Sequence, residues 1–355
     1  MLGLVLPLAV YAVVLVLHVV LPGRRVTGYA VDPATGERLR YRLNGLLVFG
    51  LTVGLFVAAA EARWLPWDLF WRHRVTAAIG ACVLGLVFTA WIVLGRGAAP
   101  GRGLLSDLYL GRLENPRVLG GRVDLKMFLY LVGATMLELN LVSSAAHHVL
   151  THPAGPSPGV LLHTALFSFF LVDYMFFEEV HLYTYDLVAE RVGFKLGWGC
   201  LVFYPFFYNV GLWSVADRDD LVTPPAVLVV AALLFLGGWT LSRGANLQKF
   251  LHKTRPGAAL LGVLRPETLD GKILVSGFWG LARHINYLGE ILMASGLALS
   301  FGLPGPLGAW LYPLFYVALL VPRERDDDRR CAAKYGPLWD DYRRRVPSRI
   351  IPHIY

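Results

Sequence analysis

Cysteine and charge are both scarce in this 355-residue chain. The three cysteines, Cys82, Cys200 and Cys331, form neither a close pair nor a metal-type spacing, so a disulfide scaffold and a zinc domain find no support. Charged residues make up only 16% of the chain, whereas 56% are apolar or aromatic and the mean hydropathy is +0.53. This balance excludes a disordered or fibrous protein and is too hydrophobic for an ordinary soluble domain. The composition predicts an integral membrane protein.

Long hydrophobic runs, separated by short polar loops, dominate the sequence instead. At about 20 residues per membrane span, they predict an all-α, polytopic membrane protein with about eight to ten transmembrane helices. A β-barrel is disfavoured because the apolar residues come in runs and do not alternate. The candidate spans are residues 2–21, 46–60, 75–94, 127–149, 160–177, 192–215 and 225–241, followed by broken stretches at 274–301 and 307–321.

The chain changes character after Leu241. From Arg243 onward, charged residues interleave with aromatic residues and glycines, and the apolar stretches become short. Broken helices are tolerated in a membrane only where they line a cavity inside the protein. We therefore expect one integrated bundle with two parts: N-terminal transmembrane helices at 1–241, and a C-terminal half at 242–355 that carries the chemistry.

Positive charge exceeds negative charge, with a net charge of +8 and a pI near 9.4. The basic residues lie in loops and in the tail, where they hold spans at the cytoplasmic face, so membrane lipids are expected partners and nucleic acid is not. Four histidines, at positions 147, 148, 152 and 163, surround a loop without the helix or cysteine pattern of a zinc site. No metal is predicted.

Polar side chains are concentrated in the segment 277–290. If a helix begins near Arg283, then Arg283, Tyr287 and Glu290 share one of its faces. So many donors beside apolar spans are costly unless they find partners or a ligand. The alternative is a juxtamembrane loop with Trp279 in the aromatic belt. Composition alone leaves both interpretations open.

Two further clusters flank this segment. Arg323, Asp327, Cys331 and Tyr335 recur every four residues along one helical stripe, and Gly336 followed by proline ends that helix. The alternative is an amphipathic tail with surface ion pairs, which are worth little. The other cluster comprises Arg243, Asn246, Gln248, Lys249 and Lys253 after the span 225–241. It is either a stop-transfer flank or a set of donors for phosphates, although no Rossmann or P-loop pattern accompanies it.

The same clusters carry a family resemblance that covers most of the chain. Its C-terminal part comprises segment 277–290, Arg323, Glu324, Asp327, Cys331, Lys334, Tyr335, Gly336, Trp339, Tyr342, Val346 and Pro347, and its upstream part includes Tyr41, Asn44, Gly45, Arg243, Asn246, Gln248 and Lys249. This pattern resembles the sterol reductase family, which includes the sterol C14 reductases, the 7-dehydrocholesterol reductases and the lamin B receptor.

The resemblance implies an NADPH-dependent reductase of a sterol carbon–carbon double bond, with about ten transmembrane helices. By analogy with the family, the cofactor is bound by the C-terminal half, through Arg243, Asn246, Lys249, Lys253, Trp279, His284, Asn286, Tyr287, Arg323, Asp327 and Tyr335. An isolated alkene is not electrophilic, so a buried acid must protonate it before hydride can attack. The candidate acids are Tyr342, Glu178 and Asp186, and the two carboxyls could instead form structural ion pairs, for example with Lys195.

The C14–C15 bond is the expected target, and the C7 and C24 bonds are alternatives. Segment 186–194 resembles the C14 branch, whereas segments 198–201 and 277–280 resemble the 7-dehydrocholesterol branch. Two other classes remain open: an isoprenylcysteine-type membrane methyltransferase and a non-catalytic sterol-binding protein. The expected location is a bacterial inner membrane or the endoplasmic reticulum membrane, with the NADPH site on the cytosolic side.

Overall fold

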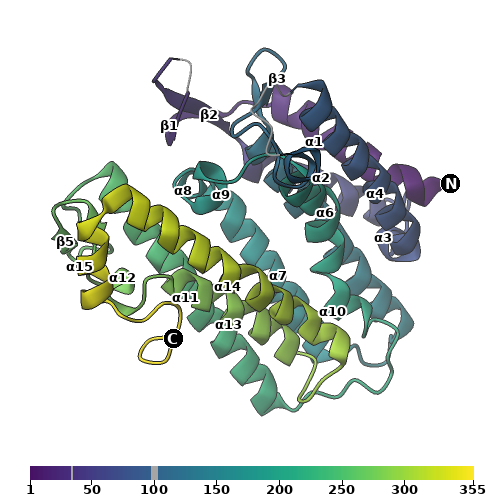
Figure 1. Ribbon diagram of the computed structural model, residues 1–355. Coiled ribbons are helices and arrows are strands. Elements are labelled where there is room, and N and C mark those ends of the chain that lie inside the picture. Colours follow the sequence, from purple (N-terminus) through teal and green to yellow (C-terminus); the bar gives the residue numbers. More distant parts are fainter. Residues whose placement is uncertain (33–34, 97–102) are drawn as a thin grey trace. The chain divides into compact units, whose positions relative to one another are not determined.

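The computed structural model describes residues 1–32, 35–96 and 103–355, and it is mostly helical (Figure 1). Within these residues, five helical segments are long and apolar enough to cross a membrane: α1 (Leu2–Val20), α4 continued by η1 (Arg74–Gly95), α6 (Leu125–Thr151), α7 (Pro158–Phe176) and α11 (Pro225–Thr254). A helix satisfies its own backbone hydrogen bonds, and this is required in a membrane because lipid tails offer no hydrogen-bonding partners. The all-α polytopic fold is thereby confirmed, and the number of ten spans stays a prediction.

The chain divides into two compact units. The first comprises Met1–Pro156 and Phe167–Asp219, and the second comprises Ser157–Leu166 and Asp220–Tyr355, so α7 contributes to both. The sequence predicted a different division, into residues 1–241 and 242–355, and that boundary stays a prediction.

In the first unit, α6 is the central helix. It packs against α1, α2 (Gly45–Glu61) and the π-helical segment η2 (Phe194–Phe207). Most residues of its apolar stretch are buried inside the protein. The segment 192–215, which the hydrophobic pattern predicts as one span, is interrupted: η2 ends at Phe207, and the short helix α10 follows at Val210–Trp213. Pro205, which lacks a backbone N–H, lies within η2.

Three small two-stranded sheets were not expected from the hydrophobic pattern. The largest is an antiparallel hairpin of β1 (Arg24–Val31) and β2 (Arg38–Leu43) between α1 and α2. The other two pair β3 (Arg117–Val118) with β4 (Val123–Asp124), and β5 (Thr268–Leu269) with β6 (Ile273–Leu274). Short helices complete the first unit: α3 (Leu69–Arg72), α5 (Leu104–Leu110), α8 (Glu178–His181) and α9 (Tyr185–Val188).

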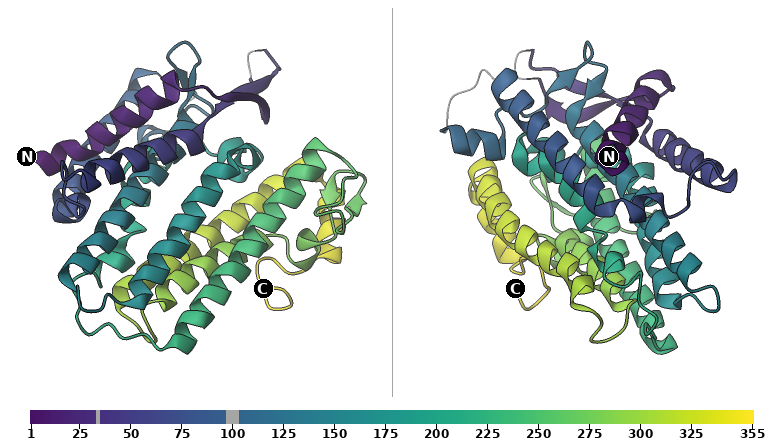
Figure 2. Two further views of the ribbon diagram at one scale, coloured as in Figure 1. Left: turned by 180° about the vertical axis from the view of Figure 1, so that it is seen from behind. Right: turned by 90° about the vertical axis from the view of Figure 1, so that its right-hand side faces the viewer.

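In the second unit, α11 packs along α13 (Ile285–Leu299), and α13 packs in turn against α14 (Leu307–Tyr335) (Figures 1 and 2). Glycines allow this close packing: a Cβ at Gly289 would lie 2.5 Å from the carbonyl oxygen of Gly238. Interfaces of small residues are typical of helices that pack within membranes. The helix α11 continues to Thr254, well beyond the predicted span end at 241, so its basic residues lie on a helix.

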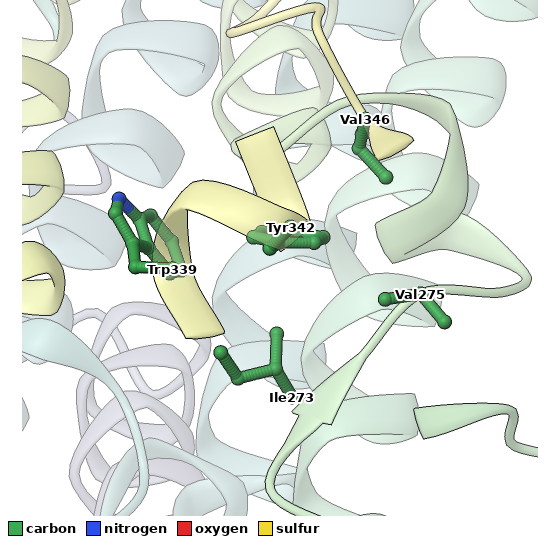
Figure 3. Packing of buried hydrophobic residues seen from close by; sticks show 5 residues of the cluster. All are labelled: Ile273, Val275, Trp339, Tyr342 and Val346. Carbon is green, nitrogen blue, oxygen red and sulfur yellow. The ribbon is translucent and has the colours of Figure 1, made fainter. Parts of the chain in front are cut away.

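A sharp corner joins α14 to the last helix, α15 (Pro337–Arg345). Gly336 has a positive φ of 55°, which favours glycine, and Pro337 opens α15 because its fixed φ suits the first helical position. The predicted helix end at this glycine is confirmed. Figure 3 shows the hydrophobic cluster that fixes α15, formed by Ile273, Val275, Trp339, Tyr342 and Val346.

Candidate functional site

Gln248 and Trp279 attach the segment before α13 to the polar end of α11. The carboxamide of Gln248 accepts a hydrogen bond from the Phe278 backbone N–H at 3.0 Å and donates one to the Ser276 carbonyl oxygen at 3.0 Å. The indole Nε1 of Trp279 donates to the Ala245 carbonyl oxygen at 2.8 Å. These bonds fix the short helix α12 (Phe278–Leu281) beside α11. The Trp279 ring is therefore held in place before any ligand binds.

Four of the predicted binding residues lie on the second half of α11. The Lys249 ammonium lies 5.8 Å from the centre of the Trp279 ring, within the range of a cation–π interaction. Lys253, one turn later, reaches the Lys272 carbonyl oxygen beside the β5–β6 hairpin at 3.5 Å. Arg243 is buried, and Asn246 is half-buried.

Helix α13 begins at Ile285, two residues later than the sequence suggested. The backbone N–H groups of Arg283 and His284 donate to the Ser348 and Arg349 carbonyl oxygens, at 3.0 Å and 2.7 Å. Because these groups are engaged with the tail, Arg283 lies before the helix. The expected helical face shared by Arg283, Tyr287 and Glu290 is therefore wrong for its first member.

His284 and Asp327 form the centre of the candidate site. His284 is 3% exposed, its ring stacks on Tyr287, and its Nδ1 lies 3.9 Å from Asp327 Oδ2. Burial, reinforced by Arg283, lowers the pKa of His284 to about 3, so its ring is neutral at physiological pH. Burial raises the pKa of Asp327, and Lys249 opposes that rise. A neutral imidazole, a carboxyl and an ammonium thus come together from three different elements.

Two polar atoms of this cluster are buried without a hydrogen-bond partner among the described residues. They are Nε2 of His284 and Oδ1 of Asn286. Leaving such atoms unpaired costs about 1 to 3 kcal/mol each, so an orphan pair at one place indicates a ligand or a water. Cations outnumber anions around Asp327, on which Lys249, Arg330 and Arg323 all act. The residues present therefore fit an anionic ligand that also offers hydrogen-bonding groups, as a phosphorylated dinucleotide does.

The stripe on α14 is present, but its last two members face a different neighbour. Burial raises the pKa of Cys331 to about 12; the charge of Asp327 adds to this rise, and the charge of Lys249 opposes it. Tyr335 instead stacks near Trp339 of α15, with ring centres 6.3 Å apart. Arg323 and Asp327 therefore belong to the cluster around His284, whereas Cys331 and Tyr335 both pack against the hydrophobic cluster of Ile273, Val275, Trp339, Tyr342 and Val346.

The first unit holds the candidate acid Glu178 at the start of α8. The two oxygens of its carboxylate share one hydrogen bond from the Gly45 backbone N–H at the start of α2, at 3.0 Å and 3.2 Å. It lines an open hollow of about 450 Å³ with Arg24, Asn44 and apolar side chains. Burial raises the pKa of Glu178 to about 7, although the Gly45 bond and Arg24 oppose the rise. Glu178 can therefore hold a proton near neutral pH.

Asp186, also in the first unit, lies next to a buried lysine. The ammonium of Lys126 donates to the carbonyl oxygens of Asp186 and Leu187, at 3.3 Å and 2.9 Å, and Lys126 is fully buried. The ion pair proposed for Lys195 lies elsewhere, because its ammonium contacts the carboxylate of Glu190 at 2.6 Å.

Tyr342, the candidate acid of the second unit, is part of the cluster in Figure 3. It is 2% exposed, and its hydroxyl donates to the Trp279 carbonyl oxygen at 2.9 Å. Burial raises its pKa above the usual value. The proton of Tyr342 is thus retained and already engaged with the backbone.

Sequence reasoning assigned no role to two buried acids on α14, Glu324, which appeared only as part of the family pattern, and Asp328. Asp328 is one of three consecutive aspartates, and no property of the residue type distinguishes the buried one from its exposed neighbour Asp326. The available signal is their spacing, since positions four apart share one helical face.

Comparisons with known proteins cover nearly the whole chain. The family model described as the ergosterol biosynthesis ERG4/ERG24 family matches residues 4–355. The delta(14)-sterol reductase of Arabidopsis thaliana is 34% identical over 350 residues, which are 95% of this chain and 91% of that protein. The delta(14)-sterol reductase of Methylotuvimicrobium alcaliphilum is 33% identical over 354 residues, 96% of this chain and 80% of that protein. The mouse protein named delta(14)-sterol reductase TM7SF2 is 32% identical over 353 residues, 94% and 81% of the two chains.

Proposed function

Because this chain belongs to the ergosterol biosynthesis ERG4/ERG24 family, we propose that it reduces a carbon–carbon double bond of a sterol with NADPH, at C14–C15. Relatives named delta(14)-sterol reductase, similar over nearly the full length, support the reaction and its position. The observation that carries the cofactor assignment is the cluster of Lys249, His284 and Asp327, with its surplus of cations and its unpaired buried atoms. Cationic side chains suit NADPH, whose 2′-phosphate adds negative charge.

The residues around this cluster have distinct roles in the proposal. Lys249 and Lys253 hold phosphates, and Arg243 and Asn246 add donors from the same helix. The adenosine and ribose are held by aromatic and hydrogen-bonding groups near α13, which are Trp279, His284, Asn286 and Tyr287. The nicotinamide half is held by three residues of α14, which are Arg323, Asp327 and Tyr335.

The chain's own acid supplies the proton of the reaction. When bound, NADPH supplies the hydride. A sterol alkene accepts that hydride only as a carbocation, so an acid of the protein must first protonate one of the alkene carbons. Of Glu178, Asp186 and Tyr342, we favour Glu178, because it borders an open hollow and holds a proton up to about pH 7. General-acid assistance of this kind is typically worth about 10² to 10⁴ in rate.

The test uses purified protein in detergent with a Δ8,14 sterol, a Δ7 sterol and a Δ24 sterol, each with NADPH or NADH. We expect NADPH oxidation only with the Δ8,14 sterol, and a product two mass units heavier. Reduction of the Δ7 or the Δ24 sterol instead would mean that the enzyme reduces that bond and not the C14–C15 bond. If the protein oxidises NADPH with none of the sterols, the proposal is overturned. Methyl transfer from S-adenosylmethionine to a prenylated cysteine would then indicate the methyltransferase class. Sterol binding without any reaction would indicate a non-catalytic protein.

We propose that the C-terminal half faces the cytosol, in a bacterial inner membrane or in the endoplasmic reticulum membrane, because NADPH is available on that side. A reporter fused after residue 355 tests the orientation. Alkaline phosphatase should be inactive and a fluorescent protein bright at this position if the tail is cytosolic, and the opposite pattern would place it outside.

A further inference from the structure

Two acidic residues on one face of α14 are buried and hold basic side chains of the second unit. Glu324 is 0% exposed, and its carboxylate lies 3.3 Å from Arg349 Nη1. Asp328, which is 6% exposed, accepts hydrogen bonds from Arg343 Nη2 at 2.6 Å and from Trp339 Nε1 at 3.0 Å. Carboxylates remain charged at such depth only when their charge is matched by partners. This face of α14 is thus occupied by contacts inside the protein.

Arg283 connects the same face to residues 346–349, here called the tail segment. Its Nη1 donates to the carbonyl oxygens of Val346 and Pro347, at 2.8 Å and 3.0 Å. Its Nε lies 3.7 Å from Asp328 Oδ1, and the whole side chain is buried. The two carbonyls are bonded by Nη1 and the carboxylate lies near Nε, so the planar guanidinium presents separate nitrogens to the two sides, which the single nitrogen of an ammonium does not.

Main-chain bonds add to this attachment. The N–H groups of Arg283 and His284, described above, donate to carbonyls of the tail segment, and the Ser348 hydroxyl oxygen accepts from the His353 N–H at 2.9 Å. The two residues before α13 therefore meet the two neighbouring aspartates of α14: Arg283 faces Asp328, and His284 faces Asp327.

We infer that the tail segment sets the position of His284 relative to Asp327, and that Arg283, Asp328 and Glu324 are positioning residues for the candidate nucleotide site. The inference rests on the proposed function for its kinetic consequence. Without the charge of Asp328, the buried guanidinium of Arg283 loses a partner, and its hold on the tail carbonyls weakens. His284 then moves with the backbone of residue 283, although none of the side chains assigned to the nucleotide has been replaced.

The experiment compares Asp328→Asn with Asp326→Asn in the full-length protein. Asp326 lies on the same helix, but it is 59% exposed and pairs with the exposed Arg329. For Asp328→Asn we expect faster hydrogen exchange of the amides at 283–287 and a KM for NADPH raised by about tenfold, with kcat within about threefold. For Asp326→Asn we expect neither change. Asp328→Glu keeps the charge and should recover part of the affinity.

Other outcomes decide against the inference. Unchanged exchange at 283–287 in Asp328→Asn, or a fall in kcat at constant KM, overturns it. If Asp328→Asn does not fold, Arg283→Lys takes its place, because its single ammonium nitrogen cannot lie both at the Nη1 position beside the tail carbonyls and at the Nε position beside Asp328. Unchanged exchange and KM in this variant overturn the inference equally. Failure of the proposed function is distinguishable: a wild-type protein that neither binds nor oxidises NADPH contradicts the function, while hydrogen exchange still shows whether the tail segment holds His284.

Discussion

His284 and Asp327 approach to 3.9 Å, measured from Nδ1 to Oδ2, without forming a hydrogen bond. Since the low pKa of His284 leaves its ring neutral, the pair is not an ion pair. The cations that act on Asp327 come from elsewhere, and Lys249 is foremost among them. The charge balance at this point of the second unit therefore depends on Lys249 more than on the histidine.

Replacing Lys249 with glutamine should weaken NADPH binding. The change removes a charge near Asp327 and Trp279 while keeping a polar side chain of similar length. A charge-assisted contact to phosphate is worth about 1.5 to 3 kcal/mol, so we expect the Kd to rise by about 10-fold to 100-fold. Titration calorimetry with detergent-solubilised protein measures this change.

Lys272→Gln is the matched control for this experiment. Lys272 is 61% exposed on the β5–β6 hairpin, where it pairs with Asp270. Its removal should leave the Kd unchanged. If the Kd for NADPH rises equally in both variants, NADPH binding depends on the overall charge of the protein and not on a site at Lys249.

The rate of sterol reduction should fall with rising pH if Glu178 is the proton donor. Its pKa is raised to about 7, so the acid form dominates below that pH and is lost above it. We expect kcat to fall by about tenfold per pH unit above 7, and Glu178→Gln to lose most activity and this pH dependence. The measurement is a kcat profile from pH 5.5 to 9 at saturating NADPH.

Glu179→Gln serves as the control for Glu178. Glu179 is the next residue and pairs with Arg24, which also opposes the raised pKa of Glu178. Its replacement should therefore keep the rate at low pH, and the released Arg24 should move the fall in kcat to a lower pH. A Glu178→Gln variant with full activity would exclude Glu178 as the donor and leave Asp186 or Tyr342.

Tyr342→Phe should affect stability more than catalysis. The substitution keeps the ring in the cluster of Figure 3 and removes only the hydrogen bond to the Trp279 carbonyl. We expect a loss of about 1 kcal/mol in stability, seen as a lower Tm, with kcat within about threefold. A fall of 100-fold or more in kcat with intact NADPH binding would instead identify Tyr342 as the proton donor.

The helices that depend on local pattern were predictable from the sequence. The first span was expected at 2–21 and is α1 at Leu2–Val20, and the stop at Gly336 is where α14 ends. Runs of apolar residues and a glycine followed by proline determine such features within a few residues. The long-range arrangement of the tail is different, because it depends on residues far apart in sequence.

The start of α13 and the pairing of charges show what the sequence could not supply. Arg283 has a helical pattern, but its N–H is bonded to Ser348, so tertiary contact overrides the local signal. Likewise, only the fold reveals that Asp328 is buried while Asp326, two residues earlier, is exposed. Three consecutive aspartates have the same propensity, and their environments come from elements that meet only in three dimensions.

The packing of α11 against α13 should tolerate no added methyl group at Gly289. A Cβ there would lie 2.5 Å from the Gly238 carbonyl oxygen and 2.5 Å from the Ser242 N, and backbone atoms cannot move aside as a flexible side chain can. Gly289→Ala should therefore cost about 1 to 3 kcal/mol, measured as a lower Tm in detergent. Gly237→Ala is the control, because nothing lies within 4 Å of its Cβ position. Alanine is the better helix former, so this variant should be neutral or slightly more stable. Equal Tm values for the two variants would mean that the helices can separate at Gly289 without loss, and that α11 and α13 are not held by direct backbone contact.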